Sequence, residues 1–535
     1  MKDLKNALTE EFWQSFSLEE EDIEFLYNFF LENEKPAKKE LLVTEIIQHK
    51  IASERKRLET LQSKSALYMP KDSFEIGTTL SFSALKMKTG TITAIREGYN
   101  PDIPSFKVIE VEFDNGDIRE FASDLENHVL NEPILFDPND PNFDIDFVLT
   151  NYRIPITSGL EKSLADNGSF SSIADEWFPE SLLIEVNEGH LNLAEAVLDF
   201  SSREPVSTSF ICEQTGLTDD NQALIEFSLN IAMQADPRFD EVGPAGEVLW
   251  FLTALEPTEV NEQPKTLLSV TPQEFLGSAD ALENSVQINL FEGVIADEYE
   301  IREIETNEVD KLTFSLIYPH WREGTLPLSD ELRTFFPTAI NSPHIRFTFI
   351  DGHTKNTFPG WVVRQHNYVC GLKDWYQKLE LLPGSLVHIS KGKKPGEVII
   401  RADKKRPSRQ WIRVAKVNSN DKLVFSMDMA VVKTGYNDRM ILMIDDPDKL
   451  DNLWLSTVTA HKFEETLKYI MRELVKLNPQ GHVHAQELYA ATNLILRTPP
   501  RAILSVLNNA DWVSHEGDLY YRLADSNQEE ANNDG

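Results

Sequence analysis

Cysteine is nearly absent from this chain of 535 residues, which has only Cys212 and Cys370. The two lie far apart and neither belongs to a CxxC pair, which excludes a disulfide framework and a cysteine-built zinc site and suits a reducing compartment. No run approaches 18 apolar residues, and the acidic amphipathic N-terminal stretch has no apolar signal core. We therefore expect a soluble, cytoplasmic protein that has no membrane partner.

Motifs for nucleotide binding and covalent catalysis are also missing. The sequence has no Gly-rich phosphate loop of the Walker type, no GxGxxG after an expected strand and no GxSxG elbow. Five of the 12 histidines fall between His320 and His388, but none has the spacing of an HExxH zinc site. The pair Glu110-Val-Glu112 lacks the following lysine that a nuclease strand would need. We therefore expect a protein without a catalytic residue, a metal site or another cofactor.

Positive charge is scarce, with 51 Lys and Arg against 88 Asp and Glu and a net charge of −37. Such acidity keeps a large protein in solution and opposes indiscriminate binding to nucleic acid. More than half of the acid lies in the first 260 residues, whereas residues 391–416 are basic. The cations of this basic run are Lys391, Lys393, Lys394, Arg401, Lys404, Lys405, Arg406, Arg409, Arg413 and Lys416. A basic run in an acidic chain indicates an anionic partner such as nucleic acid, although Lys404-Lys-Arg406 also suits a solvated linker.

The first 132 residues predict a helical region followed by a small barrel. Apolar residues recur every three or four positions from Ile23 to Ile51, which predicts packed helices in residues 1–70. In residues 71–132 the period changes to two, and Asp114-Asn-Gly116 marks a hairpin turn. This order of strands resembles the Tudor-like barrels found on helicases and RNA-polymerase-binding proteins.

Residues 201–260 and 451–525 share one order of elements. Each has a short helix, a turn, a longer helix and two strands joined by a Gly-containing hairpin. This order resembles the winged-helix modules of RNA-polymerase-associated and chromatin proteins. In the second module Arg497 and Arg501 stand at the longer helix, where a recognition helix would meet phosphate or base edges. The first module is acidic at that place, which suits contact with RNA polymerase or another protein.

Residues 306–416 predict a β-barrel with two short helices and with turns at Asp351-Gly352 and Pro383-Gly384. Four motifs carry a resemblance here: Gly324-Thr-Leu-Pro-Leu328, Trp361-Val-Val-Arg364, Gly371-Leu-Lys-Asp-Trp375 and Leu382-Pro-Gly-Ser-Leu-Val-His388. They resemble the DNA-binding pseudobarrel of plant auxin-response-type regulators, which is shared with the effector domains of some restriction endonucleases. The family usually has an acidic residue where this chain has Ser385.

The resemblance implies two loop arms that grip the major groove of DNA. One arm would be His320, Trp321 and Arg322, and the other Arg364, Gln365, His366 and Asn367. Arg can bind guanine through two hydrogen bonds, Asn and Gln can do so with adenine, and Lys can hold phosphate. The predicted nucleic-acid-binding residues are these seven with Lys391, Lys393, Lys394, Lys404, Lys405, Arg406, Arg409, Arg497 and Arg501. The alternative is that Trp321 is a core aromatic and that the loops are solvated surface.

The remaining segments connect these modules. We expect a linker and helical region in residues 133–200, a linker with helical content in 261–305, a β-rich connector in 417–450 and a disordered tail in 526–535. The predicted fold is thus multi-domain α+β, with a helical N-terminal region, a small β-barrel, two winged-helix-like modules and a β-pseudobarrel.

Three functions remain open on this sequence. The first is a non-catalytic accessory factor in transcription or DNA transactions that binds DNA through the pseudobarrel and a winged helix. The second is an acidic scaffold for protein interactions, and the third is a non-catalytic subunit of a DNA-processing or defence complex. The sequence leaves open the nucleotide sequence bound, the choice between DNA and RNA, and the oligomeric state.

Overall fold

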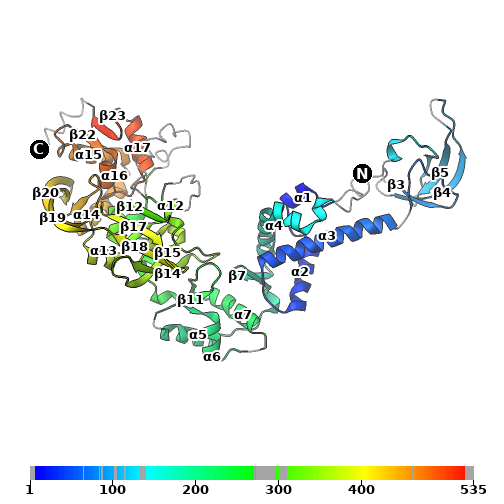
Figure 1. Ribbon diagram of the computed structural model, residues 1–535, viewed down its shortest axis with the longest axis horizontal. Coiled ribbons are helices and arrows are strands. Elements are labelled where there is room, and N and C mark those ends of the chain that lie inside the picture. Colours follow the sequence, from blue (N-terminus) through cyan, green and yellow to red (C-terminus); the bar gives the residue numbers. More distant parts are fainter. Residues whose placement is uncertain are drawn as a thin grey trace. The chain divides into compact units, whose positions relative to one another are not determined.

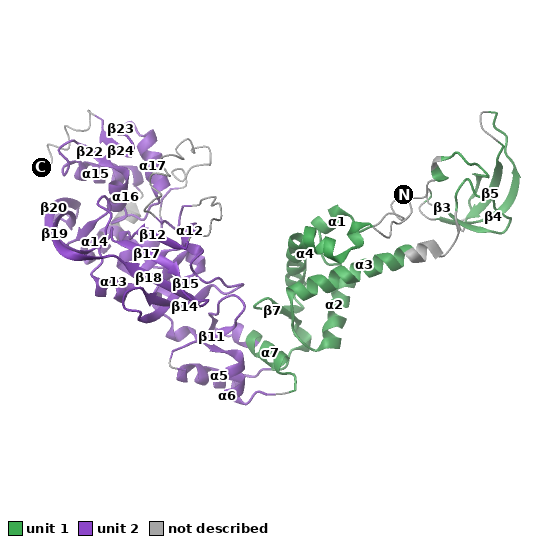
Figure 2. Cartoon of the chain, in the orientation of Figure 1, with its two compact units in different colours: residues 1–185, 219–231 green, residues 186–218, 232–535 purple. Residues whose placement is uncertain are grey.

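The computed structural model describes residues 7–63, 66–82, 85, 88–101, 105–113, 116–131, 140–201, 203–218, 220–269, 271–272, 296–300, 310–460 and 462–524 (Figure 1). They form two compact units, residues 1–185 with 219–231 and residues 186–218 with 232–535 (Figure 2). The mixed α+β class predicted from the sequence is confirmed. The tail predicted at 526–535 and most of the segment 261–305 lie outside the described residues. Within the described residues, no helix combines the length and apolarity needed to cross a membrane.

The first unit has a helical part. Its main helices are α1 (Glu10–Gln14), α2 (Glu20–Asn33), α3 (Lys39–Ser63) and α4 (Ile145–Asn167). The apolar stripe of α2 is buried at Leu26 and Phe30, as its spacing predicts. A sheet of order β1-β8-β7 (Ala37–Lys38, Glu176–Pro179 and Phe170–Ile173) lies against it, and the rings of Phe30 and Phe178 meet edge-on at 5.4 Å.

A five-stranded sheet occupies the place of the predicted small barrel. Its order is β2-β3-β4-β5-β6, with bounds Ala66–Leu67, Thr79–Phe82, Lys88–Glu97, Lys107–Phe113 and Ile118–Ser123. The pairs from β3 to β6 are antiparallel, and their inward side chains, including Phe82, Ile109 and Val111, form a separate core. Residues 114 and 115 of the predicted turn lie outside the described residues.

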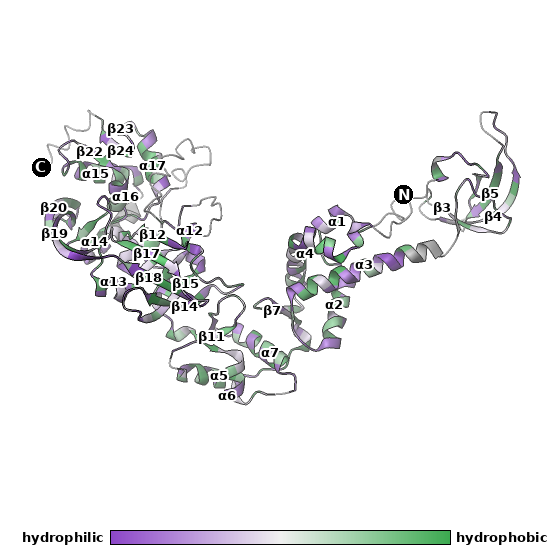
Figure 3. Cartoon of the chain, in the orientation of Figure 1, coloured by the Kyte–Doolittle hydropathy of each residue, from purple (hydrophilic) through white to green (hydrophobic). Residues whose placement is uncertain are grey.

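The second unit is built around a curled seven-stranded half-barrel. The strand order is β12-β17-β18-β14-β15-β16-β13. The bounds are Lys311–Ser315 for β12, Leu386–Lys391 for β17, Glu397–Ala402 for β18, His344–Asp351 for β14, Thr357–Val363 for β15, Tyr368–Cys370 for β16 and Thr325–Pro327 for β13. Only β14 and β18 pair in parallel among these described strands. The sheet carries many hydrophobic residues (Figure 3), because its side chains enter two cores, one that includes Phe349, Val369 and Ile389 and another that includes Trp361 and Tyr368.

Three short helices interrupt this sheet. They are α11 (Tyr318–Glu323), α12 (Asp330–Arg333) and α13 (Lys373–Leu379). The segment of α11 was expected to be a turn, yet Pro319 stands at the start of a helix and Gly324 ends it with a φ of 70°. A Cβ at Gly324 would lie 2.5 Å from the backbone nitrogen of Lys373, so the close approach of α13 also favours glycine there.

A long hairpin follows the half-barrel. It consists of β19 (Lys404–Val417) and β20 (Leu423–Thr434), with β21 (Leu442–Ile444) parallel to β19. The boundary predicted after residue 416 therefore falls inside one strand pair. The turn before β17 packs onto this hairpin, where Ser385 is fully buried and its hydroxyl lies 3.3 Å from that of Thr434. A carboxylate at position 385 would be buried at this contact, which gives a physical reason for serine.

Both stretches expected to be winged helices contain helices followed by a strand pair. In the second, β22 (His482–His484), α16 (Ala485–Thr492) and α17 (Pro500–Asn509) precede β23 (Val513–Gly517) and β24 (Tyr520–Leu523). They follow α14 (Pro447–Ala460) and α15 (Phe463–Val475). In the first, β9 (Val206–Ser207), α6 (Thr208–Thr215) and α7 (Gln222–Gln234) precede β10 (Phe239–Glu241) and β11 (Leu249–Leu252), with α5 (Glu188–Phe200) before them.

Candidate nucleic-acid interface

Three loops meet at one edge of the seven-stranded sheet because of the way its strands pair. Residues 364–367 join β15 to β16, and β14 begins opposite the end of β15. Residues 392–396 join β17 to β18, and β18 begins alongside β14 in the same direction. Residues 334–343, between α12 and β14, therefore lie between the other two loops.

These loops line two adjoining hollows, which we call the loop-edge groove. The first hollow has a volume of about 610 Å³ and the second of about 490 Å³, and Phe336, Pro337 and Thr338 line both. The charged and amide side chains that line the groove are Arg333, Asn341, Arg364, Gln365, Asn367, Lys391, Lys393, Lys394 and Glu397. Of the ionisable side chains in this set, five are cations and only Glu397 is an anion. This balance is the reverse of that of the whole chain, whose net charge is −37.

The lysines of the groove are available to a ligand. Lys391, Lys393 and Lys394 are exposed and form no ion pair within the part of the chain that the structure describes. The backbone N–H of Lys394 donates to Oε2 of Glu397 at 3.2 Å, which shapes the tight 392–396 turn without using a lysine ammonium. Flexible, solvated ammonium groups at a turn suit contact with phosphate rather than with one base.

The arginines and amides of the groove are held by local hydrogen bonds. Nη2 of Arg333 donates to Oδ1 of Asn367 at 2.6 Å, and Nη1 of Arg364 donates to the carbonyl of Ser342 at 2.9 Å. Asn367 has a φ of 55°, in the left-handed region that asparagine tolerates better than most residues. Gln365 is exposed between them. The predicted second arm is thus a short ordered turn with the exposed amide of Gln365 and the guanidinium group of Arg364, which is partly committed to a backbone carbonyl. His366 stacks on Tyr368 behind it.

The predicted first arm lies elsewhere. His320, Trp321 and Arg322 are on helix α11 instead of on a loop, and α11 leads into the start of β13, at the opposite end of the β13–β16 pair from residues 364–367. His320 is fully buried, and Nε1 of Trp321 donates to the carbonyl of Leu381 at 2.7 Å. The structure therefore does not bring the two arms together, and Trp321 is a partly buried packing residue.

Arg322 is occupied by acidic partners of the same unit. Its Nη2 lies 2.6 Å from Oδ2 of Asp451 and 2.8 Å from Oδ1 of Asp448, both on α14. These two carboxylates raise the pKa of the guanidinium against the effect of burial, which lowers it. An anionic ligand would have to compete with two carboxylates for this side chain.

The basic run does not form one surface. Lys391 lies opposite Val398 near the start of β18, at the edge of the sheet that bears the loop-edge groove. β18 ends at the opposite edge of the sheet and leads there into β19. Lys404, Lys405, Arg406 and Arg409 are exposed on β19, where the ammonium group of Lys405 lies 4.8 Å from the ring centroid of Tyr436. The hairpin cations are therefore separated from the groove by the length of a strand.

Arg497 and Arg501 make contacts inside the second unit. Arg497 has no exposed surface, and its Nη2 lies 2.8 Å from Oδ1 of Asp297 and from Oε2 of Glu298. Arg501 is one third exposed, and its Nε lies 3.3 Å from a carboxylate oxygen of Glu300. The structure therefore does not present Arg497 to a nucleic acid, because the acidic segment 296–300 already fills the space around it.

The five histidines that drew attention in the sequence have separate environments. His320 lies between Thr325 and Glu298, His388 contacts Thr313, and His353 contacts the carbonyl of Ala402. His366 stacks on Tyr368, as described above. His344 is the exception, because it lies beside two carboxylates, Asp240 and Glu256. No metal was expected from the spacing of these histidines, and neither acidic partner is near His344 in the sequence.

Sequence reasoning missed several residues of the groove. Arg333, Thr338, Asn341 and Ser342 come from α12 and the loop that follows it. Arg333 reaches the second arm through the pairing of β13 with β16, and Ser342 reaches it through the pairing of β14 with β15. The position of Arg333 inside one of the two expected short helices was the one available signal. No family model, curated protein or solved structure matches this chain.

Proposed function

We propose that this protein is a non-catalytic accessory factor in transcription or DNA transactions that binds duplex DNA at the loop-edge groove. The observation that carries the proposal is the charge of the groove, with five cations against one anion in a chain that is otherwise strongly acidic. A local positive surface on an acidic body favours a specific anionic partner over indiscriminate binding.

The groove supplies both kinds of group that a DNA-binding surface needs. Lys393 and Lys394 are exposed and flexible, so they would contact phosphate and set the position of the duplex. Gln365 is exposed at the tip of the neighbouring turn, and its amide would form two hydrogen bonds with adenine in the major groove. Arg364 would contact guanine through the nitrogens that Ser342 does not use.

The secondary structure of this region is compatible with the proposal. Residues 311–402 form seven strands, β12 to β18, and contain the short helices α12 and α13. The second arm lies in the groove, whereas the first arm does not. The proposal therefore rests on the second arm and the lysine turn, and the contacts predicted for His320, Trp321, Arg322 and Arg497 are not part of it.

Fluorescence anisotropy of the full chain with random duplex DNA tests this proposal. If three to five phosphates are contacted, the affinity should fall roughly 40- to 500-fold between 50 and 200 mM salt. Lys393→Ala/Lys394→Ala should weaken binding and make it less dependent on salt. Lys404→Ala/Lys405→Ala removes the same charge from the exposed hairpin and should leave binding nearly unchanged. Equal losses in the two double variants, or no binding at low salt, would contradict the proposal.

A second candidate function is a scaffold for protein interactions, and the hairpin favours it. The outer face of the hairpin exposes Trp411, Met429 and Val431, with 63%, 52% and 52% of their surface accessible. Trp411 and Met429 are cross-strand partners, so these side chains form one apolar stripe. If the full chain fails to bind DNA but retains protein partners after nuclease treatment, the scaffold becomes the better account.

A further inference from the structure

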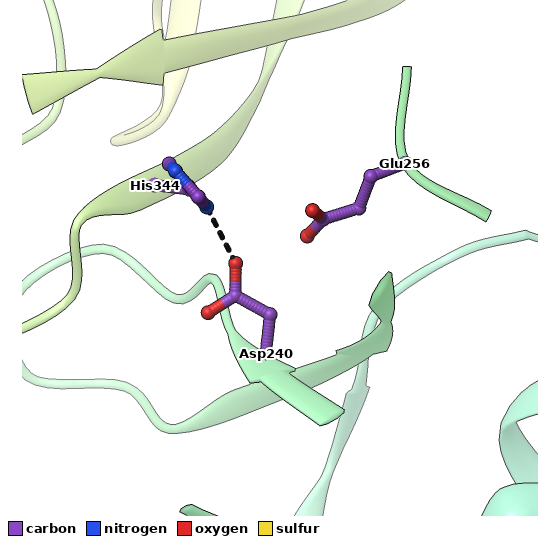
Figure 4. Close-up of side chains that lie close together, drawn as sticks. All are labelled: Asp240, Glu256 and His344. Carbon is purple, nitrogen blue, oxygen red and sulfur yellow. Dashed lines mark hydrogen bonds and ion pairs between the residues drawn. The ribbon is translucent and has the colours of Figure 1, made fainter. Parts of the chain in front are cut away.

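One histidine and two carboxylates from distant parts of the chain meet beside the half-barrel (Figure 4). Asp240 is on β10, His344 is the first residue of β14, and Glu256 follows the short helix η5 (Thr253–Leu255). One ligand atom from each lies within 4.8 Å of the other two. Oδ2 of Asp240 lies 2.7 Å from Nδ1 of His344, and the carboxylate of Glu256 faces both.

Hydrogen bonds between neighbouring segments hold Asp240, Glu256 and His344 together. The backbone N–H of Arg346 on β14 donates to the carbonyl of Val242 at 3.0 Å, which holds the end of β10 against β14. The hydroxyl of Ser342 donates to the carbonyl of Glu241 and strengthens the same contact. β10 also pairs with β11, and η5 continues directly from β11, so Glu256 after η5 lies near Asp240 on β10. The three side chains are therefore held by paired strands and a short helix, which is a rigid support for a ligand site.

The carboxyl group of Glu256 lies in this cluster without a good hydrogen bond. Both of its oxygens are buried, and no hydrogen bond of good geometry reaches them from the described residues. A buried carboxyl that faces a second carboxylate and an imidazole is a group that a bound cation would stabilise as the anion.

We propose that Asp240, Glu256 and His344 bind a divalent transition-metal ion, with zinc as the best match. Two carboxylate oxygens and one imidazole nitrogen are ligands that zinc accepts, with water at the remaining position. The imidazole disfavours calcium and magnesium, which take oxygen ligands. The absence of a cysteine among the three also makes soft, thiolate-binding ions a poor match. This proposal is independent of DNA binding.

The site joins two parts of the second unit. Asp240 and Glu256 come from the segment that contains β10, β11 and η5, and His344 comes from the half-barrel. The metal would therefore link β10 to β14, where one backbone hydrogen bond, one hydrogen bond from the hydroxyl of Ser342 and the Asp240–His344 pair already make contact.

Calorimetric titration of the full chain with zinc chloride, after removal of metals with EDTA, tests the proposal. One site should saturate, and manganese should compete for it better than magnesium. His344→Ala and Glu256→Gln should each weaken zinc binding at least tenfold. His388→Ala is the matched control, because Nε2 of His388 lies 2.9 Å from Asp403 without a third ligand among the described residues.

Glu256→Gln also separates metal binding from folding. Glutamine has the shape and neutral charge of the protonated carboxyl that burial favours at neutral pH, so the metal-free variant should unfold at nearly the wild-type temperature. Zinc should raise the unfolding temperature of the wild type and of His388→Ala but not of Glu256→Gln. Unsaturable binding, or zinc binding that neither site variant weakens, would overturn the proposal, as would magnesium binding as tight as that of zinc.

Discussion

Replacement of Arg497 by methionine should strongly destabilise the C-terminal part of the second unit. The arginine is fully buried and its guanidinium contacts two carboxylates, those of Asp297 and Glu298. It also donates to Oδ1 of Asn493 at 3.1 Å and to the carbonyl of Thr498 at 3.0 Å. Methionine fills a similar volume but leaves two buried carboxylates without a guanidinium group. Asp297 keeps the hydroxyl of Tyr489, and Glu298 keeps the imidazole of His320.

The size of the effect follows from these contacts. Breaking a buried ion pair by removal of one partner costs about 3–5 kcal/mol. Burial alone would raise the pKa of Glu298, but the charges of Arg497 and His320 hold it at about 2. Without the arginine, Glu298 is expected to take up a proton at moderately low pH, which relieves part of the cost. The destabilisation should therefore be larger at pH 8 than at pH 5.

Hydrogen exchange measured by mass spectrometry is the appropriate assay, because a chain of two units does not unfold in one step. Amides of α16 and α17 should exchange about 150- to 5000-fold faster in Arg497→Met, the equivalent of 3–5 kcal/mol. Helix α4 of the other unit serves as the internal control and should not change. The triple variant with Asp297→Asn and Glu298→Gln should recover much of the protection, since no buried charge is left unpaired.

A change of less than tenfold in α16 and α17, or a triple variant no better than the single one, would refute this reasoning. Either result would mean that water reaches the two carboxylates once the arginine is gone. Arg497→Lys gives an intermediate test, because one ammonium group replaces the charge but not the forked pattern of donors.

Two further predictions concern pH and backbone geometry. Burial raises the pKa of Glu241 to about 7 and that of Glu256 to about 9, so the folded state retains protons that the unfolded chain releases near pH 4.5. The metal-free protein should therefore lose stability as the pH rises from about 5 to 9. Glu256→Gln should flatten the dependence of the unfolding temperature on pH. Gly384 has a φ of 95°, and an added Cβ would lie 2.4 Å from Cα of Ile441, so Gly384→Ala should cost more than the roughly 1–2 kcal/mol of a left-handed residue. Gly396 has a φ of 77°, and an added Cβ would meet no atom within 4 Å, so Gly396→Ala should show only the cost of the left-handed conformation in thermal unfolding. Equal losses of stability in the two variants would contradict a steric contact at Gly384.

Strands β14 and β18 of the half-barrel could be predicted because their side chains alternate clearly between the two faces of the sheet. In β14 the residues from His344 to Asp351 alternate between half-buried and buried without a break, as expected for a strand with one face on the core. Helix α11 was not predicted, because His320, Trp321 and Arg322 were expected in a loop arm, although Pro319 before them fits the first turn of a helix as well as a turn. Local pattern alone does not decide between these two uses of proline.

The two clusters of buried charge could not be predicted, because their members are far apart in the sequence. Asp240 and His344 are separated by 104 residues, and no spacing rule connects them. In the groove, the lysines at 391–394 were found because they form a local run, whereas Arg333 was missed because only the pairing of β13 with β16 brings it near Asn367. Local charge is visible in a sequence, but strand pairing that joins distant segments is not.

The contact between Glu298 and Arg497 also means that one part of the second unit can complete its core only late in synthesis. The two residues are 199 positions apart, which corresponds to roughly 10–40 s of synthesis at about 5–20 residues per second. During that interval Asp297 and Glu298 have no buried cation from α16 or α17 to join and must remain hydrated. The half-barrel can close during synthesis, but the core around Tyr489 and Arg497 is completed only after residue 497 has been made.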